Sequence, residues 1–112
     1  MKYLVVASGG PGFSSAEEAR EVLEKTILPS FAALNKLEAE KKILAGGLPV
    51  GDRAFVFILE ARSNEEVDQL LRDLPMLSMR GSLEWEVTPL LSFSARAAEE
   101  RKAIKAIKRA MR

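Results

Sequence analysis

The sequence contains no cysteine and no histidine. Without cysteine, thiol nucleophiles, disulfides and thiolate metal sites are excluded. Without histidine, the commonest general base and the commonest metal ligand are missing. Acid–base chemistry would therefore fall to carboxylates, lysines or the single tyrosine, Tyr3.

No signal for a metal or a cofactor is present either. No loop is dense enough in carboxylates to hold a cation through oxygen ligands. The glycine-rich loop at residues 9–12 lacks the third glycine of a dinucleotide fingerprint and the lysine of a P-loop. We therefore expect no metal and no cofactor.

Long apolar runs are also lacking. None of the apolar runs in the 112 residues is long enough to cross a membrane. The opening residues, MKYLVVASGG, predict a first strand rather than a signal peptide, because no small-residue cleavage site is evident. We expect a chain with a single core, located in the cytoplasm and without a membrane partner.

Charge is unevenly distributed, although the net charge is only +1. Residues 1–95 carry 10 Lys/Arg and 14 Asp/Glu, a net −4, whereas residues 96–112 carry 7 Lys/Arg and 2 Asp/Glu, a net +5. A basic segment could contact nucleic acid or anionic lipid. A solvated helix, or one docked on an acidic surface of the same protein, is favoured because no aromatic residues are interleaved with the basic ones. Nucleic acid is therefore a disfavoured partner.

The strongest strand signal is Arg53–Ala61, RAFVFILEA. Alternation places apolar residues on both of its faces: Phe55, Phe57 and Leu59 on one, and Ala54, Val56 and Ile58 on the other. Tyr3–Ser8 is a second strand of this kind. A strand that is apolar on both faces must be covered on both faces. Lys41–Gly46 and Ser82–Leu91 are predicted as the two remaining strands.

Two capping-box patterns mark the predicted helix starts. Ser15-Ala-Glu-Glu18 precedes an apolar stripe at helical spacing that continues to about residue 40. Pro29 interrupts this stripe, so we expect either one bent helix or two short ones. Ser63-Asn-Glu-Glu66 begins a second helix that ends near residue 73. The basic tail is predicted as a third helix with Ser94 as its N-cap.

The predicted order is β-α-β-β-α-β followed by a tail helix, which is the split βαβ arrangement of ferredoxin-like α+β folds with an antiparallel sheet. We expect residues 1–93 to form this domain and residues 94–112 to form the basic tail. The first and third strands, which are apolar on both faces, are predicted as central parallel neighbours. Both helices cross one side of such a sheet, so a second copy is expected to cover the other side, giving a dimeric α+β barrel or a higher homo-oligomer.

Several stretches resemble muconolactone Δ-isomerase-like proteins, which are dimeric α+β barrels. These are AGG at Ala45–Gly47, RAFVFILEA, the SNEEVDQLLRDLPM helix and the LEWEVTPL strand. The resemblance covers roughly residues 40–91 and leaves out the basic tail. Its most specific parts are Leu74-Pro75 and the Glu84-x-Glu86-Val87 pattern. The resemblance implies an allylic proton shift, but family members contain histidines, so no catalytic pair is carried over to this chain.

The candidate chemistry is therefore assigned from the residues themselves. Glu84 and Glu86 share one face of the last strand, opposite Trp85, and are the first candidates for a catalytic base. The alternative is two exposed glutamates on an edge strand, where charge opposes aggregation. Burial in an apolar cleft raises the pKa of a carboxyl group, which suits a base near neutral pH. Tyr3 is a candidate donor to an oxyanion, or else a core residue with a satisfied hydroxyl.

Arg53 and Arg80 are candidates for holding a substrate carboxylate, the alternative being ordinary surface arginines. Two functions stay open. The first is an isomerase that moves a proton within a small lactone or organic acid. The second is a non-catalytic module that uses the same fold to bind a small ligand or to assemble.

Overall fold

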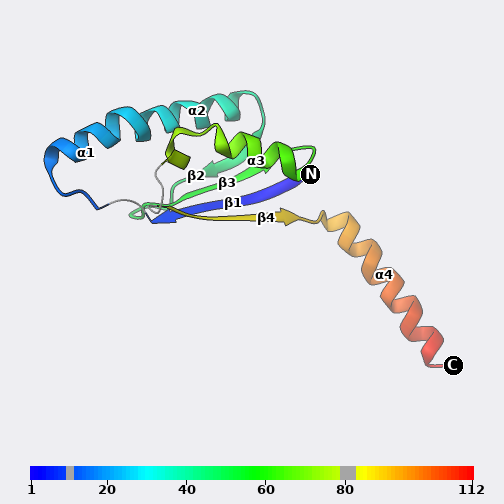
Figure 1. Cartoon of the computed structure of the whole chain (residues 1–112). Helices are drawn as coiled ribbons and strands as arrows, with labels where there is room; N and C mark the ends of the chain where they lie inside the picture. Colours follow the sequence, from blue (N-terminus) through cyan, green and yellow to red (C-terminus); the bar gives the residue numbers. More distant parts are fainter. Residues whose placement is uncertain (10–11, 79–82) are drawn as a thin grey trace.

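In the part of the chain that the structure describes, four strands form one antiparallel sheet, and helices cover one of its faces (Figure 1). The computed structural model describes residues 1–9, 12–78 and 83–112. The strands are β1 (Lys2–Gly9), β2 (Ile43–Gly47), β3 (Phe55–Glu60) and β4 (Leu83–Leu90), in the order β2-β3-β1-β4. The predicted α+β class and the β-α-β-β-α-β order are confirmed.

The two central strands are β1 and β3, as predicted, but they are antiparallel rather than parallel. The register runs from Lys2 opposite Glu60 to Ala7 opposite Phe55. The prediction of parallel pairing was wrong. The helical crossover makes β2 run parallel to β1, and the β2–β3 hairpin then reverses the chain, so β3 runs antiparallel to β1. β4 pairs with the other side of β1, also antiparallel.

The first helical run is continuous, which decides between the two predicted alternatives. It comprises α1 (Ala16–Val22), a π-helical segment (Leu23–Ile27) and α2 (Leu28–Ala39). The Leu28 N–H donates to the Leu23 carbonyl, five residues earlier. A proline in an α-helix clashes with the carbonyl four residues before it. The wider π turn directly before Pro29 removes that conflict, so the helix continues.

The ends of this run explain its boundaries. Ser15 is the N-cap, and its Oγ accepts from the Glu18 N–H at 3.1 Å. The Ser14 hydroxyl and N–H both donate to the Glu18 carboxylate, and the hydroxyl bond is the main reason why the pKa of that carboxyl lies below its ordinary value. At the other end, Lys41 has φ +61°, a left-handed conformation that ends the helix. β2 therefore starts at Ile43 rather than at the predicted Lys41.

α3 (Asn64–Arg72) has Ser63 as its N-cap, as predicted, and the Ser63 Oγ accepts from the Glu66 N–H at 3.2 Å. A short 3₁₀ turn, Pro75–Ser78, follows it. The core lies between the sheet and the helices. Its buried side chains come from the helix-facing sides of β1, β2 and β3, from the residue after β3, from α3 and from the residues that follow α3: Tyr3, Val5, Ala7, Ile43, Phe55, Phe57, Leu59, Ala61, Val67, Leu71, Leu74 and Met76.

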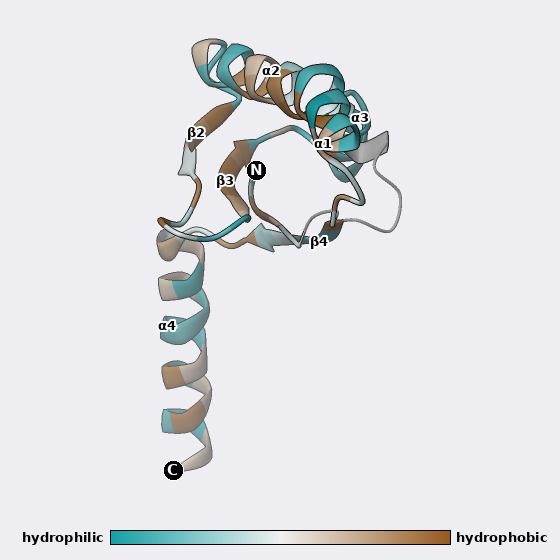
Figure 2. Cartoon of the chain, turned by 90° about the vertical axis from the view of Figure 1, so that its left-hand side faces the viewer, coloured by the Kyte–Doolittle hydropathy of each residue, from teal (hydrophilic) through white to brown (hydrophobic). Residues whose placement is uncertain are grey.

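The opposite face of the sheet carries none of the helices α1–α3, and we call it the open face (Figures 1 and 2). Its apolar side chains come from the alternate positions of the two central strands and are half-buried: Leu4, Val6, Val56 and Ile58. Cross-strand pairing places Leu4 beside Ile58 and Val6 beside Val56. The prediction that the central strands are apolar on both faces is confirmed.

The tail forms α4 (Phe93–Ala110), which points away from the rest of the chain on the side opposite α1–α3 (Figures 1 and 2). Its N-cap is Ser92, whose Oγ accepts from the Ala95 N–H at 3.0 Å. The predicted N-cap, Ser94, was wrong because the helix already begins two residues earlier. The molecule is consequently elongated, measuring 73 × 28 × 25 Å. In the described part of the chain, no helix has the length and apolarity needed to cross a membrane.

Candidate functional site

A cavity of about 290 Å³ opens between the helical layer and one end of the sheet. Its walls come from the π-helical segment and α2, from Phe13 in the loop before α1, from the ends of β1, β3 and β4, and from the β2–β3 connection. Most of them are apolar: Gly9, Phe13, Leu23, Ile27, Phe31, Leu48, Phe55 and Leu83. The two polar lining residues are Asp52 and Arg53. We call this space the rim cavity.

The π-helical segment shapes the roof of the rim cavity. Leu23 and Ile27, its first and last residues, both line the space. Below them the rings of Phe31 and Phe55 lie 5.5 Å apart between centroids, inclined at 42°. Tilted aromatic pairs at this separation attract each other and make a stiff wall. The π-helical segment and the Phe31–Phe55 pair thus both form walls of the rim cavity.

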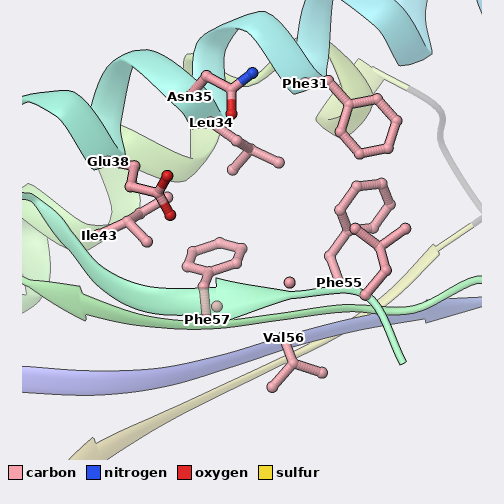
Figure 3. Close-up of a pocket in the computed structure, with 11 residues that line it drawn as sticks. Phe31, Leu34, Asn35, Glu38, Ile43, Phe55, Val56 and Phe57 are labelled. Carbon is pink, nitrogen blue, oxygen red and sulfur yellow. The ribbon is translucent and has the colours of Figure 1, made fainter. Parts of the chain in front are cut away.

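A narrower pocket of about 120 Å³ continues under α2 and shares Phe31, Leu48 and Phe55 with the rim cavity. Figure 3 shows Leu34, Asn35 and Glu38 descending from α2 towards Ile43 and Phe57, whereas Val56 points to the other side of the sheet. Glu38 and Asn35 supply the polar groups of this inner pocket. Together the two spaces form an apolar groove with polar groups at each end.

The turn before β3 positions the polar pair at the rim. Asp52 donates its N–H to the Pro49 carbonyl at 3.1 Å, and Gly51 has φ +82°, a conformation that glycine adopts without strain. The Arg53 N–H donates to Asp52 Oδ1 at 2.7 Å. Both side chains are exposed to solvent and both line the cavity. The turn therefore presents a carboxylate and a guanidinium at one opening.

Arg53, predicted from the sequence as a substrate-binding residue, lines the rim cavity, and its role stays a prediction. Asp52 was missed, because an aspartate in a Gly-Asp turn is explained by turn formation alone. Glu38 was missed as well, since it lies on a helix among other charged residues. Only the tertiary packing brings these groups to one groove.

Tyr3 is 1% exposed and lies on the helix-facing side of β1. Its hydroxyl donates to Asn64 Oδ1 at 2.8 Å, at the start of α3. It lines a separate cavity of about 220 Å³ with Asn64, Val67 and Pro89. Tyr3 therefore lies at the opposite end of β1 from Gly9, which lines the rim cavity.

Glu84 and Glu86 lie on the open face of β4 and are exposed. They pair across the strands with Ser8 and Val6, whereas Trp85 packs against the core. The predicted side of each residue is thus the observed one. The sheet separates these carboxylates from Arg53 and the rim cavity within one chain, so the structure does not bring Glu84 and Glu86 together with Arg53.

Arg80, the second predicted substrate-binding residue, lies outside the described residues. Among residues 1–9, 12–78 and 83–112, no group of three or more acidic side chains is arranged to hold a metal ion.

The sequence matches no protein-family model and no curated protein. Among solved structures, the chain is similar to 5-chloro-2-hydroxyhydroquinone dehydrochlorinase (TftG) from Burkholderia phenoliruptrix AC1100, in complex with 2,5-dihydroxybenzoquinone. The TM-score is 0.63 at 22% sequence identity, and the similarity covers 84% of this chain and 97% of that one. Such a similarity shows the fold alone: this chain shares the α+β fold of that protein, with the β-α-β-β-α-β order and one antiparallel sheet of the ferredoxin-like arrangement.

Proposed function

We propose that this chain is a muconolactone-isomerase-like protein that binds a small lactone or unsaturated organic acid in the rim cavity. One observation carries the proposal: apolar walls enclosing about 290 Å³ meet a guanidinium and a carboxylate at the same opening. Ligand sites typically combine an apolar pocket with a few placed polar groups. Arg53 would pair with a ligand carboxylate through two parallel hydrogen bonds.

Two further observations support a small-ring ligand. The chain resembles muconolactone isomerases over roughly residues 40–91, and its fold is that of a dehydrochlorinase described in complex with a quinone. The stiff wall formed by Phe31 and Phe55 offers a surface on which a flat ring can stack. The ring would lie against this wall, with its carboxylate at Arg53.

The proposed reaction is an allylic proton shift. Asp52 removes a proton from the allylic carbon that the ring double bond conjugates with the lactone carbonyl, and the electron pair delocalises as a dienolate onto the carbonyl oxygen. The protonated carboxyl then returns the proton to the carbon next to the carbonyl, so the double bond moves without net gain or loss of atoms. Arg53 holds the ligand carboxylate and so keeps the ring in place beside Asp52.

Glu84 and Glu86 remain the alternative base. They would act only if a second copy packs against the open face and encloses them, because each is exposed in the single chain. The open face carries half-buried apolar residues on both central strands, which favours a homodimer closed through this face. In that arrangement the cleft between the sheets would be the reaction site.

The non-catalytic alternative also has a specific observation in its favour. Asp52 is exposed, and no buried side-chain polar atom in the described residues is without a hydrogen-bond partner. A module that only binds a small organic acid needs Arg53 and the apolar walls but no base. The isomerase therefore requires the Asp52 carboxylate as a base, whereas the binding module does not.

Ultraviolet-monitored turnover of muconolactone separates these possibilities. We expect Asp52→Asn to lower kcat by about 10²-fold or more, because a general base is lost. We expect Arg53→Gln to raise KM by about tenfold or more, because a charge-assisted hydrogen bond is lost. Glu86→Gln serves as the matched control and should behave like the wild type.

Other results would redirect the proposal. Collapse of turnover in Glu86→Gln with an active Asp52→Asn variant would move the base to the open face. Absence of turnover in folded wild-type protein that still binds the lactone through Arg53 would establish the binding module. Neither turnover nor binding would refute muconolactone as the ligand.

A further inference from the structure

α4 is an 18-residue helix that buries none of its side chains against the described residues of its own chain. None of its residues is buried, and Phe93 is 96% exposed. Most helices in proteins gain their stability from packing an apolar face rather than from helix propensity alone. Its own support is limited to the Ser92 cap and exposed pairs such as Arg96 with Glu99 at 3.3 Å. We therefore expect α4 to pack on a surface outside its own chain.

One narrow stripe of α4 is suited to packing. At 3.6 residues per turn its apolar side chains fall within one seam, interrupted by Glu100: Phe93, Ala97, Ile104, Ile107 and Met111. The larger of these side chains are at least half exposed. The spacing of three and four residues is that of helices that pack lengthwise on a partner.

A row of positive charge runs beside this seam. The same helical geometry places four basic residues on one flank: Arg101, Lys105, Lys108 and Arg112. Lys102 and Arg109 lie on the side of the helix opposite the seam. A surface that receives α4 should therefore offer apolar side chains bordered by carboxylates.

The chain carries a surface of this description on its edge strand β4. Glu84 and Glu86 are exposed there on the open face, and two apolar residues are exposed at the end of the strand and just beyond it: Leu90 at 39% and Leu91 at 51%. We call these four residues the β4 border. An exposed edge strand is a site for unwanted pairing, which proteins often prevent by covering it. The β4 border thus presents both the apolar contacts and the negative charge that α4 lacks.

α4 is not packed on the β4 border of its own chain. It begins directly after that strand and points away from it (Figures 1 and 2). We propose that α4 docks on the β4 border of a second copy, with its seam against the apolar residues and its basic flank against Glu84 and Glu86. The net charges of the two segments, −4 for residues 1–95 and +5 for residues 96–112, favour this contact. The inference rests on the proposed homodimer but not on the proposed chemistry.

Full-length charge-reversal variants test the contact by sedimentation over a dilution series. Arg101→Glu/Lys108→Glu should weaken self-association by about tenfold or more, because like charges then face each other. Lys102→Glu/Arg109→Glu, with the same residue types and the same charge change on the far side of α4, should stay within about threefold of the wild type. Adding Glu84→Lys/Glu86→Lys to the first variant should restore association, and circular dichroism should show that each variant is folded.

Four outcomes would overturn the inference. If the wild type is monomeric, there is no second copy on which α4 could dock. An unchanged dimer in Arg101→Glu/Lys108→Glu would leave the homodimer proposal intact and place its contact elsewhere. Equal weakening by the control, or salt-sensitive capture of monomers by anionic phospholipid vesicles or duplex DNA, would mean that the charge of α4 serves another partner.

Discussion

At the scale of single residues, Gly46 shows how closely two strands approach. A Cβ atom built on Gly46 would lie 2.5 Å from the Phe57 Cβ and 2.6 Å from the Val56 carbonyl oxygen. One built on its neighbour Gly47 would meet nothing within 4 Å. The β2–β3 pairing beneath the inner pocket therefore depends on one of these two glycines and not on the other.

Gly46→Ala should lower the free energy of unfolding by about 1–3 kcal/mol, because the clash is with backbone and Cβ atoms that cannot rotate away. Gly47→Ala, the matched control on the same strand, should change it by no more than about 0.5 kcal/mol. Denaturant unfolding of both variants measures the difference. Equal effects at the two positions would contradict the close approach.

At the same scale, the positions of some candidate site residues could be predicted from the sequence, while their roles stay predictions. Arg53 could be proposed because it stands at a strand end, where cavity mouths form. The faces of Glu84 and Glu86 followed from strand alternation. Asp52 could not be identified as a candidate from the sequence, because turn formation already accounts for an aspartate at this position. The cavity that it lines is built from segments far apart in the sequence.

At the scale of elements, helix caps and hydrophobic periodicity in the sequence predicted most of the helices and strands. Ser15 and Ser63 begin helices as predicted, and the strand apolar on both faces is central. The direction of β3 relative to β1 was misjudged, because direction follows from the connections and not from the composition of either strand. The π-helical turn before Pro29 could not be predicted beyond an interruption of the helix.

The start of α4 gives a prediction at this scale. Ser92→Ala should reduce the helicity of the first turn of α4, because the N–H of Ala95 loses its acceptor, a loss of about 1 kcal/mol. Ser94→Ala should leave it unchanged or slightly raised, since alanine has the higher helix propensity. Cα chemical shifts of residues 93–96 report the difference. The reverse order of effects would restore Ser94 as the cap.

At the scale of the whole molecule, the sequence indicated a sheet with one uncovered face and a basic tail outside the domain. The structure places both, with α1–α3 on one side of the sheet and α4 pointing away on the other (Figure 2). It also provides what patterning could not: a groove between helices and sheet, separated by the sheet from the predicted carboxylates. The central claim is that this groove, and not the open face, holds the ligand.

The most direct test is a titration of ¹⁵N-labelled protein with muconolactone, followed by NMR. The account predicts shift changes at the amides that surround the rim cavity, including Phe31, Leu48, Arg53 and Phe55, and their loss in Arg53→Gln. Shift changes confined to β4 around Glu84 and Glu86 would contradict it and place the ligand on the open face.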